Sequence, residues 1–162
     1  MRAWGVALFI LVIPIVGVPA AASKSQASNA EAGVRAVWNA QAAAWNRGDL
    51  PGYMAGYWKS PDLVFFSNGT ATRGWQATLD RYRAAYQGEN RHMGQLDFPE
   101  LEVVVLGPDA ALVRGRWHLT MPDGKASEGM TSVVFRKLPE GWRIVHDHSS
   151  RAQGAASAGL VW

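Results

Sequence analysis

The sequence predicts an α+β domain in which N-terminal helices pack on one face of an antiparallel sheet. Two observations carry this prediction. Apolar residues first recur at helical spacings of three and four, at Val34, Trp38, Ala42 and Trp45. After residue 94 the chain instead shows strand-like runs separated by the tight-turn signals Gly107-Pro108-Asp109, Pro122-Asp123-Gly124 and Pro139-Glu140-Gly141.

The first helix is expected to end at Gly48, which supplies a left-handed position, and Asp49 can cap a second, short helix. A buried strand follows at residues 63–66 and stops at the turn signal of residues 67–69. Helical spacing returns in the residues Trp75, Leu79, Tyr82 and Tyr86. Strands are then expected at residues 95–98, 101–106, 111–121, 127–137 and 142–148.

The N-terminus has the three-part layout of a secretory signal, with Arg2 before an apolar run and small residues at Ala20 and Ala22. The run is broken by prolines and is shorter than the roughly 20 apolar residues of a membrane span. We therefore predict a signal peptide over residues 1–22, a linker over 23–31, one domain over 32–150 and a flexible tail over 151–162. The mature protein is expected to be exported, periplasmic or secreted, and free of the membrane.

Composition limits the function classes. The chain has no cysteine and eight tryptophans, so its stability must come from burial and hydrogen bonds. Its net charge of +3 is small and scattered, which argues against nucleic acid as a partner.

Side-chain alternation sorts the last three strands into two faces if Met121 pairs with Ala126 and Lys137 with Trp142. One face then carries Leu112, Phe135, Ile144, Arg114, Arg116, His118, Thr131, His146 and His148. The other carries Val113, Val134, Val145, Trp117, Met130 and Asp147. The first face is half apolar and half cationic, as expected for a pocket that fixes an anionic or carbonyl group. The alternative is that the arginines face solvent and the valine face forms the core.

Candidate catalytic residues are His146 and His148, with His118 as a further candidate, because histidine titrates near neutral pH. These three histidines also suggest a metal site, but neighbouring arginines would repel a cation, so no metal is expected. No nucleophilic serine motif and no paired carboxylates stand out, and no cofactor is expected.

Several segments together resemble the SnoaL-like and ketosteroid-isomerase-like branch of the nuclear transport factor 2-like superfamily, especially the group related to the calcium/calmodulin-dependent kinase association domain. The segments are residues 44–50, 64–69, 73–75, 113–117 and 141–150. The resemblance implies a cone-shaped α+β fold, with helices on a strongly curved sheet around a cavity, and commonly a homodimer. In the kinase association domain an arginine on a central strand lies in the pocket, and Arg114 resembles it.

The leading prediction is a protein that binds a small carboxylate- or carbonyl-bearing molecule. Its expected polar anchors are Arg114, Arg116, His118, Thr131, His146 and His148, and its expected walls are Trp45, Tyr57, Phe66, Tyr82 and Trp117. One alternative is an isomerase- or cyclase-like enzyme with a cavity histidine as acid or base. Another is a non-catalytic assembly module, which would have a filled cavity and an apolar dimer face.

Overall fold

The computed structural model describes residues 20–88 and 93–152. Their elements, in chain order, are α1 (Ala20–Asn46), α2 (Leu50–Met54), β1 (Val64–Ser67), β2 (Thr70–Arg73), α3 (Trp75–Tyr86), β3 (Gln95–Val105), β4 (Ala110–Thr120), β5 (Ala126–Leu138) and β6 (Gly141–Arg151). Most of the predicted signal peptide and all but the start of the predicted tail lie outside the described residues, so both remain predictions. Within residues 20–88 and 93–152, no helix combines the length and apolar character that crossing a membrane requires.

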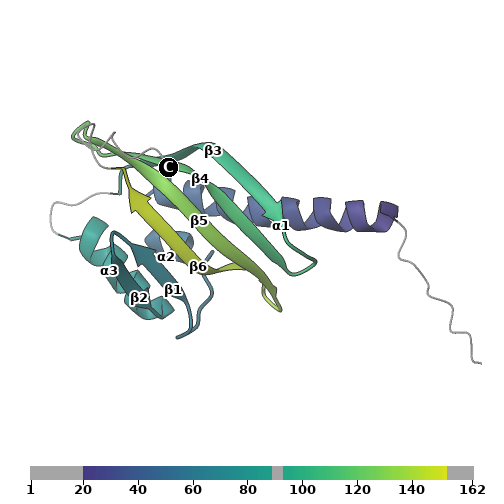
Figure 1. Ribbon diagram of the computed structural model, residues 1–162. Helices are drawn as coiled ribbons and strands as arrows, with labels where there is room; N and C mark the ends of the chain where they lie inside the picture. The colour runs from purple at the N-terminus through teal and green to yellow at the C-terminus, as the bar shows by residue number, and fades with distance from the viewer. Residues whose placement is uncertain (1–19, 89–92, 153–162) are drawn as a thin grey trace, which may run out of the picture.

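The strands form one curved, open sheet in the order β2-β1-β6-β5-β4-β3. Neighbouring strands are antiparallel except β1 and β6, which run parallel and bring the N-terminal half of the chain beside its last strand. Helix α1 runs across the sheet, while α2 and α3 lie near the end formed by β6, β1 and β2 (Figure 1). The predicted α+β class, with N-terminal helices packed on a curved sheet, is confirmed.

Helix α1 buries a stripe at Val34, Trp38, Gln41 and Trp45. The spacings of four, three and four residues place these side chains on one face, which packs on the sheet. The sequence predicted Ala42 on this stripe, but the buried position is the adjacent Gln41, whose Nε2 donates to the Tyr53 carbonyl at 2.9 Å. The predicted linker over residues 23–31 is helical instead, because α1 already begins at Ala20.

The connection from α1 to α2 follows the predicted chemistry. Gly48 has a φ of 79°, a conformation that glycine adopts readily, and it ends α1. The Asp49 carboxylate then accepts a hydrogen bond from the Gly52 N–H at 2.8 Å, which caps α2. This tight connection directs Tyr53 back against α1.

The face assignment of the sheet depends on two details that the sequence did not show. Thr120, not Met121, pairs with Ala126, so the predicted register of β4 and β5 is wrong by one residue. The pairing of Lys137 with Trp142 is confirmed, but a bulge at Val145 separates the Phe135–Ile144 pair from the Val134–His146 pair. Because side chains alternate with a period of two, the different register places the side chains of β4 on the face opposite to the predicted one. The bulge does the same for the side chains of β6 that follow it.

The resulting inner face, which packs on the helices, carries a continuous apolar core. Its sheet residues are Ala111, Val113, Val133, Phe135 and Ile144, which pack with Val34, Trp38, Leu50, Met54 and Leu63. Beside this core, the helices and the inner face of the sheet leave a space between them. This space is the candidate site.

Candidate functional site

A cavity of about 210 Å³ lies between the three helices and the inner face of the sheet. Its wall is mainly aromatic and aliphatic, formed by Trp38, Trp45, Tyr53, Tyr57, Phe65, Tyr82, Tyr86, Leu96, Phe98, Trp117, Leu119 and Ile144. The cavity can therefore hold a compact, largely apolar molecule of about one ring.

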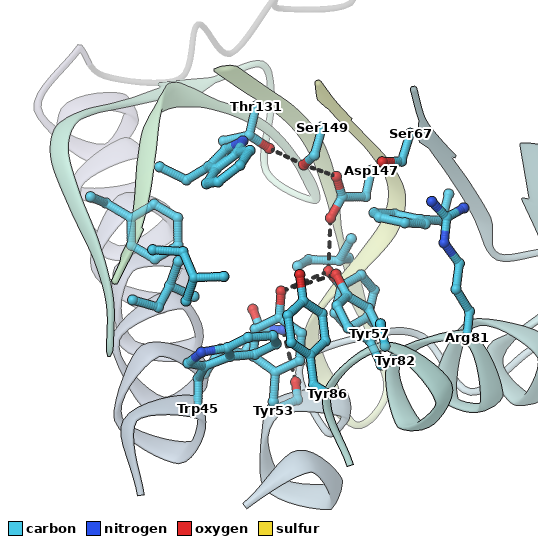
Figure 2. A pocket seen from close by; sticks show the side chains of 18 of the residues that line it. Trp45, Tyr53, Tyr57, Ser67, Arg81, Tyr82, Tyr86, Thr131, Asp147 and Ser149 are labelled. Carbon is cyan, nitrogen blue, oxygen red and sulfur yellow. Dashed lines mark hydrogen bonds between the residues drawn. The ribbon is translucent and has the colours of Figure 1, made fainter. Parts of the chain in front are cut away.

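Asp147 on β6 places a carboxyl group in this wall, and its side chain is almost fully buried. The bulge at Val145 turns Asp147 inward, and the parallel pairing with β1 sets it opposite Phe65. Tyr57 Oη donates to Oδ2 at 2.7 Å, and Ser149 Oγ donates to Oδ1 at 2.7 Å. Figure 2 shows both bonds converging on the carboxyl group.

The hydroxyl groups around Asp147 form two chains with a defined direction. Ser149 gives its one hydrogen to Asp147, so Thr131 must be the donor in the 2.9 Å contact between Thr131 Oγ1 and Ser149 Oγ. Tyr57 also gives its hydrogen to Asp147, so in the 3.3 Å contact between the hydroxyls of Tyr53 and Tyr57 the donor is Tyr53. All of these donors point toward the carboxyl group, which is the arrangement that an ionised carboxylate requires.

The tyrosine cluster continues from Tyr53 to Tyr82, whose hydroxyl oxygens are 3.3 Å apart. Burial raises the pKa of Tyr53 to about 12, with the Asp147 charge as the second cause. Burial and the same charge also raise the pKa values of Tyr57 and Tyr82 well above the ordinary tyrosine value. These hydroxyls therefore remain protonated donors at any physiological pH.

Burial raises the pKa of Asp147 to about 6, and the hydrogen bonds from Ser149 and Tyr57 oppose that increase. No lysine or arginine among the described residues forms an ion pair with it. A buried carboxyl group with hydroxyl partners alone is poised to exchange a proton near neutral pH. This combination of burial, cavity and pKa makes Asp147 the chemical centre of the site.

The cavity opens at one rim, where its more exposed lining residues gather. These are Asn68 after β1, Ala85 on α3 and Arg151 at the end of β6, with the half-buried Ser67 and Arg81 beside them. Tyr86 also reaches the cavity here, and its hydroxyl is directed inward (Figure 2). No hydrogen bond joins that hydroxyl to another side chain in the described part of the chain.

Five of the predicted site residues line this cavity: Trp45, Tyr57, Tyr82, Trp117 and Thr131. The four aromatic residues were predicted as walls, whereas Thr131 was predicted as a polar anchor. Phe66 does not line the cavity; its side chain is 37% exposed on the outer face, and its neighbour Phe65 lines the cavity instead.

The predicted cationic end of the pocket is wrong in its placement. Because of the one-residue register error and the bulge, Arg114, Arg116, His118, His146 and His148 lie on the outer face and none of them lines the cavity. Arg114 pairs with Glu102 at 2.7 Å, and Arg116 lies 3.6 Å from both Glu100 and Glu128. His118 Nδ1 is 3.1 Å from Asp97, while the rings of His146 and His148 contact Phe66.

The sequence reasoning missed Asp147, Ser149 and Arg81 as members of the site. It placed Asp147 on the same face as Val113 and Trp117. In the structure these two residues face the helices. The alternative interpretation of the sequence, in which the arginines face solvent and the valine face forms the core, would have directed the carboxyl group of Asp147 inward. Within residues 20–88 and 93–152, no three His, Cys, Asp or Glu side chains come together as metal ligands.

Comparison with known proteins establishes the family. The model of the SnoaL-like domain family matches residues 34–153, which is most of the chain, so the protein belongs to the SnoaL-like domain family. A nuclear transport factor 2-like protein of unknown function from Shewanella oneidensis MR-1 is similar in structure and sequence. It has a TM-score of 0.69 and 36% identity over 74% of this chain and 98% of its own.

Other solved structures share the fold at lower identity. A ketosteroid isomerase-like protein from Erwinia carotovora atroseptica SCRI1043 has a TM-score of 0.58 and 23% identity, over 75% of this chain and 95% of its own. A putative calcium/calmodulin dependent protein kinase II association domain from Xanthomonas campestris has a TM-score of 0.61 and 20% identity, over 75% and 87%. No curated protein matches the chain. The predicted superfamily is confirmed.

Proposed function

We propose that this domain binds one small organic molecule in the cavity and directs a hydroxyl or carbonyl group of that molecule toward Asp147 and the tyrosine hydroxyls. The observation that carries the proposal is a buried carboxyl group that forms no ion pair with a lysine or arginine of the described residues, set in an aromatic cavity. Burying a carboxyl group is costly, and a purely structural core would gain by replacing it with an apolar side chain. A ligand that uses this group accounts for its presence.

The shape and chemistry of the cavity define the ligand. An ionised carboxylate has about four lone-pair sites, of which Tyr57 and Ser149 use two, so it can accept a further bond from a ligand hydroxyl. The aromatic walls favour a ring or an unsaturated body, and about 210 Å³ limits its size to about one ring. The open cavity also argues against the assembly module, which would have a filled interior.

A thermal-shift screen with single-ring phenols and ketones tests this proposal. A ligand at one hundred times its Kd stabilises the folded protein by about 2.7 kcal/mol, which is a readily measured shift. We expect hydroxyl-bearing compounds to stabilise the wild type and to bind Asp147→Asn roughly tenfold more weakly, on the scale of one hydrogen bond to a charged group. Asp123→Asn, in the exposed β4–β5 turn, is the matched control and should bind like the wild type. Stabilisation by no compound, or equal affinity in Asp147→Asn, would refute the proposal.

A second candidate function is proton transfer next to a carbonyl group, and the Asp147 pKa of about 6 favours it. Above pH 6 the carboxylate can remove a proton from the carbon beside a ligand carbonyl. The developing negative charge on the carbonyl oxygen then needs a donor, and Tyr86 offers a hydroxyl directed into the cavity. Burial raises the pKa of Tyr86, so it remains protonated for this task. This role belongs to Asp147, not to the cavity histidine that the sequence suggested.

Proton transfer is tested by hydrogen–deuterium exchange at the carbon beside the carbonyl of a single-ring ketone, followed by proton NMR in D2O. The rate should rise with pH and level off above about pH 6, because the ionised carboxylate is the active form. Asp147→Asn should abolish the acceleration, and Tyr86→Phe should reduce it about 100-fold, as loss of an oxyanion donor does. Exchange at the rate of buffer alone would rule out this function while leaving ligand binding intact.

We also propose that the mature protein is exported and forms a homodimer through the outer sheet face. The signal-like N-terminus and the exposed side chains of Phe66 and Met130 on that face support these proposals. Cell fractionation tests the first and light scattering of the purified protein tests the second. Recovery of the protein in the cytoplasmic fraction with residues 1–22 still attached would contradict export. A monomer at micromolar concentration would contradict the homodimer.

A further inference from the structure

We infer that the ligand carries a carboxylate, which binds at the rim of the cavity between Arg81 and Arg151. This inference rests on the proposed ligand-binding function and names the class of ligand. The two arginines are the cationic side chains that line the cavity, and they approach its opening from α3 and from the end of β6.

Arg81 is held in place while part of its guanidinium stays available. One of its nitrogens donates to Thr72 Oγ1 at 3.0 Å, and the group lies 5.0 Å from the centre of the Phe65 ring. Figure 2 shows this side chain extending from α3 along the wall of the cavity. A guanidinium has five N–H donors, so the bond to Thr72 leaves others for an anion.

Arg151 faces the same opening from the other side. It is the last residue of β6, and its backbone N–H donates to Asn68 Oδ1 at 3.3 Å, which ties the strand end to the β1–β2 turn. The positive charges of Arg151 and Arg81 both oppose the increase of the Tyr86 pKa that burial causes. Both charges therefore act on Tyr86, which lines the cavity near its opening.

Neither arginine has a carboxylate partner among the described residues, in contrast to others of this chain. Six arginines of the described part lie within 4.0 Å of a carboxylate: Arg35, Arg47, Arg83, Arg114, Arg116 and Arg136. Arg83, two residues from Arg81 on the same helix, pairs with Asp80. The rim thus presents two cations at the mouth of an apolar cavity, where an anionic ligand group supplies the missing partner.

The distribution of charge also fixes the orientation of the ligand. Asp147 is buried and repels an anion, whereas the rim attracts one. A bound molecule therefore places its carboxylate at Arg81 and Arg151, its ring between the aromatic walls, and its neutral polar group at Asp147. A ligand with a second anionic group at its inner end would be rejected.

The test compares 4-hydroxyphenylacetate with its neutral analogue 4-hydroxyphenylacetamide by isothermal titration calorimetry. The two probes have similar shape and differ in charge at one end. We expect the wild type to bind the acid roughly tenfold more tightly, on the scale of a hydrogen bond to a charged group. The preference should shrink as NaCl rises from 20 mM to 500 mM, because salt screens the partly exposed rim.

The double variant Arg81→Gln, Arg151→Gln should bind the acid and the amide with about equal affinity. Its affinity for the amide should differ from that of the wild type by less than about twofold. Arg83→Gln is the matched control and should keep the wild-type preference. If the double variant does not fold, Arg151→Gln alone serves, because this exposed side chain lies at a strand end, and it should lose about half of the preference on a logarithmic scale.

The outcomes separate this inference from the function on which it rests. Equal affinity of the wild type for acid and amide overturns the carboxylate while ligand binding stands. A preference that survives in the double variant places the anion elsewhere and overturns the rim site. Binding of neither probe, together with no response to the other single-ring compounds, overturns both.

Discussion

Replacing Asp147 with asparagine is expected to change how the stability of the folded protein depends on pH. The carboxyl group has an ordinary pKa of 3.8 and a folded-state pKa of about 6, so the folded state binds the proton more tightly than the unfolded chain does. Its contribution to stability is complete below pH 3.8 and is lost as the pH rises through 6. At 1.36 kcal/mol for each pKa unit, the difference between 3.8 and about 6 corresponds to about 3 kcal/mol.

The measurement is urea unfolding of the wild type and of Asp147→Asn at pH values between 3.5 and 7.5, followed by tryptophan fluorescence. Asparagine does not titrate, so the variant keeps a constant contribution at this position. As the pH rises from 3.5 to 7.5, the free energy of unfolding of the variant should increase by about 3 kcal/mol relative to that of the wild type. This corresponds to a relative shift of about 1 to 3 M in the urea midpoint. A difference that stays constant within about 0.5 kcal/mol across the range would refute the assigned burial and pKa of this carboxyl group.

Asp49→Asn gives an internal control of opposite sign. Hydrogen bonds from the Gly52 backbone and from Arg47 lower the pKa of Asp49, so its contribution is present at neutral pH and is lost on acidification. Relative to the wild type, this variant should therefore lose stability as the pH rises, whereas Asp147→Asn gains it.

Two further substitutions test the hydrogen bonds and the packing of the site. Tyr57→Phe removes a hydrogen bond that lowers the pKa of Asp147, so a carbon-13 NMR titration of this carboxyl group should give a higher pKa than in the wild type; an unchanged value would contradict the bond. Gly129→Ala places a methyl group against the backbone carbonyl oxygen of Ser150 on the neighbouring strand and 2.6 Å from the ring of Trp117, and we expect a loss of at least about 1–3 kcal/mol in the free energy of unfolding. Gly107→Ala, where an added methyl group meets nothing within 4 Å, should cost less than 1 kcal/mol in the same assay.

The sequence predicted the connection from α1 to α2 and the helix α3 well because their signals are local. The left-handed glycine at Gly48, the cap at Asp49 and the period of α3 each depend on neighbours within one or two turns of chain. Strand β2 was missed because residues 70–73 are short, mostly exposed and lack an apolar alternation.

The candidate site was predicted only in part because its polar members depend on register. The residues between β4 and β5 allow more than one hairpin closure, and the choice between Met121 and Thr120 as the partner of Ala126 exchanges the two faces of the strand. The bulge at Val145 then turns Asp147 inward and His146 outward, and no local residue type marks it. Aromatic walls such as Trp45 and Tyr82 were found because they lie on helices, whose period is less ambiguous.

The most direct test of ligand binding in this cavity uses the indole N–H signals of the protein in proton–nitrogen NMR spectra during titration with 4-hydroxyphenylacetate. Trp38, Trp45 and Trp117 line the cavity, and their indole nitrogens have no hydrogen-bond partner among the described residues. Trp75, whose indole donates to the Met54 carbonyl at 3.0 Å, lies outside it and serves as the control. We expect saturable shifts of the three cavity signals with the Trp75 signal unchanged. Saturable binding that leaves the three signals in place would contradict the assignment of the cavity as the ligand site.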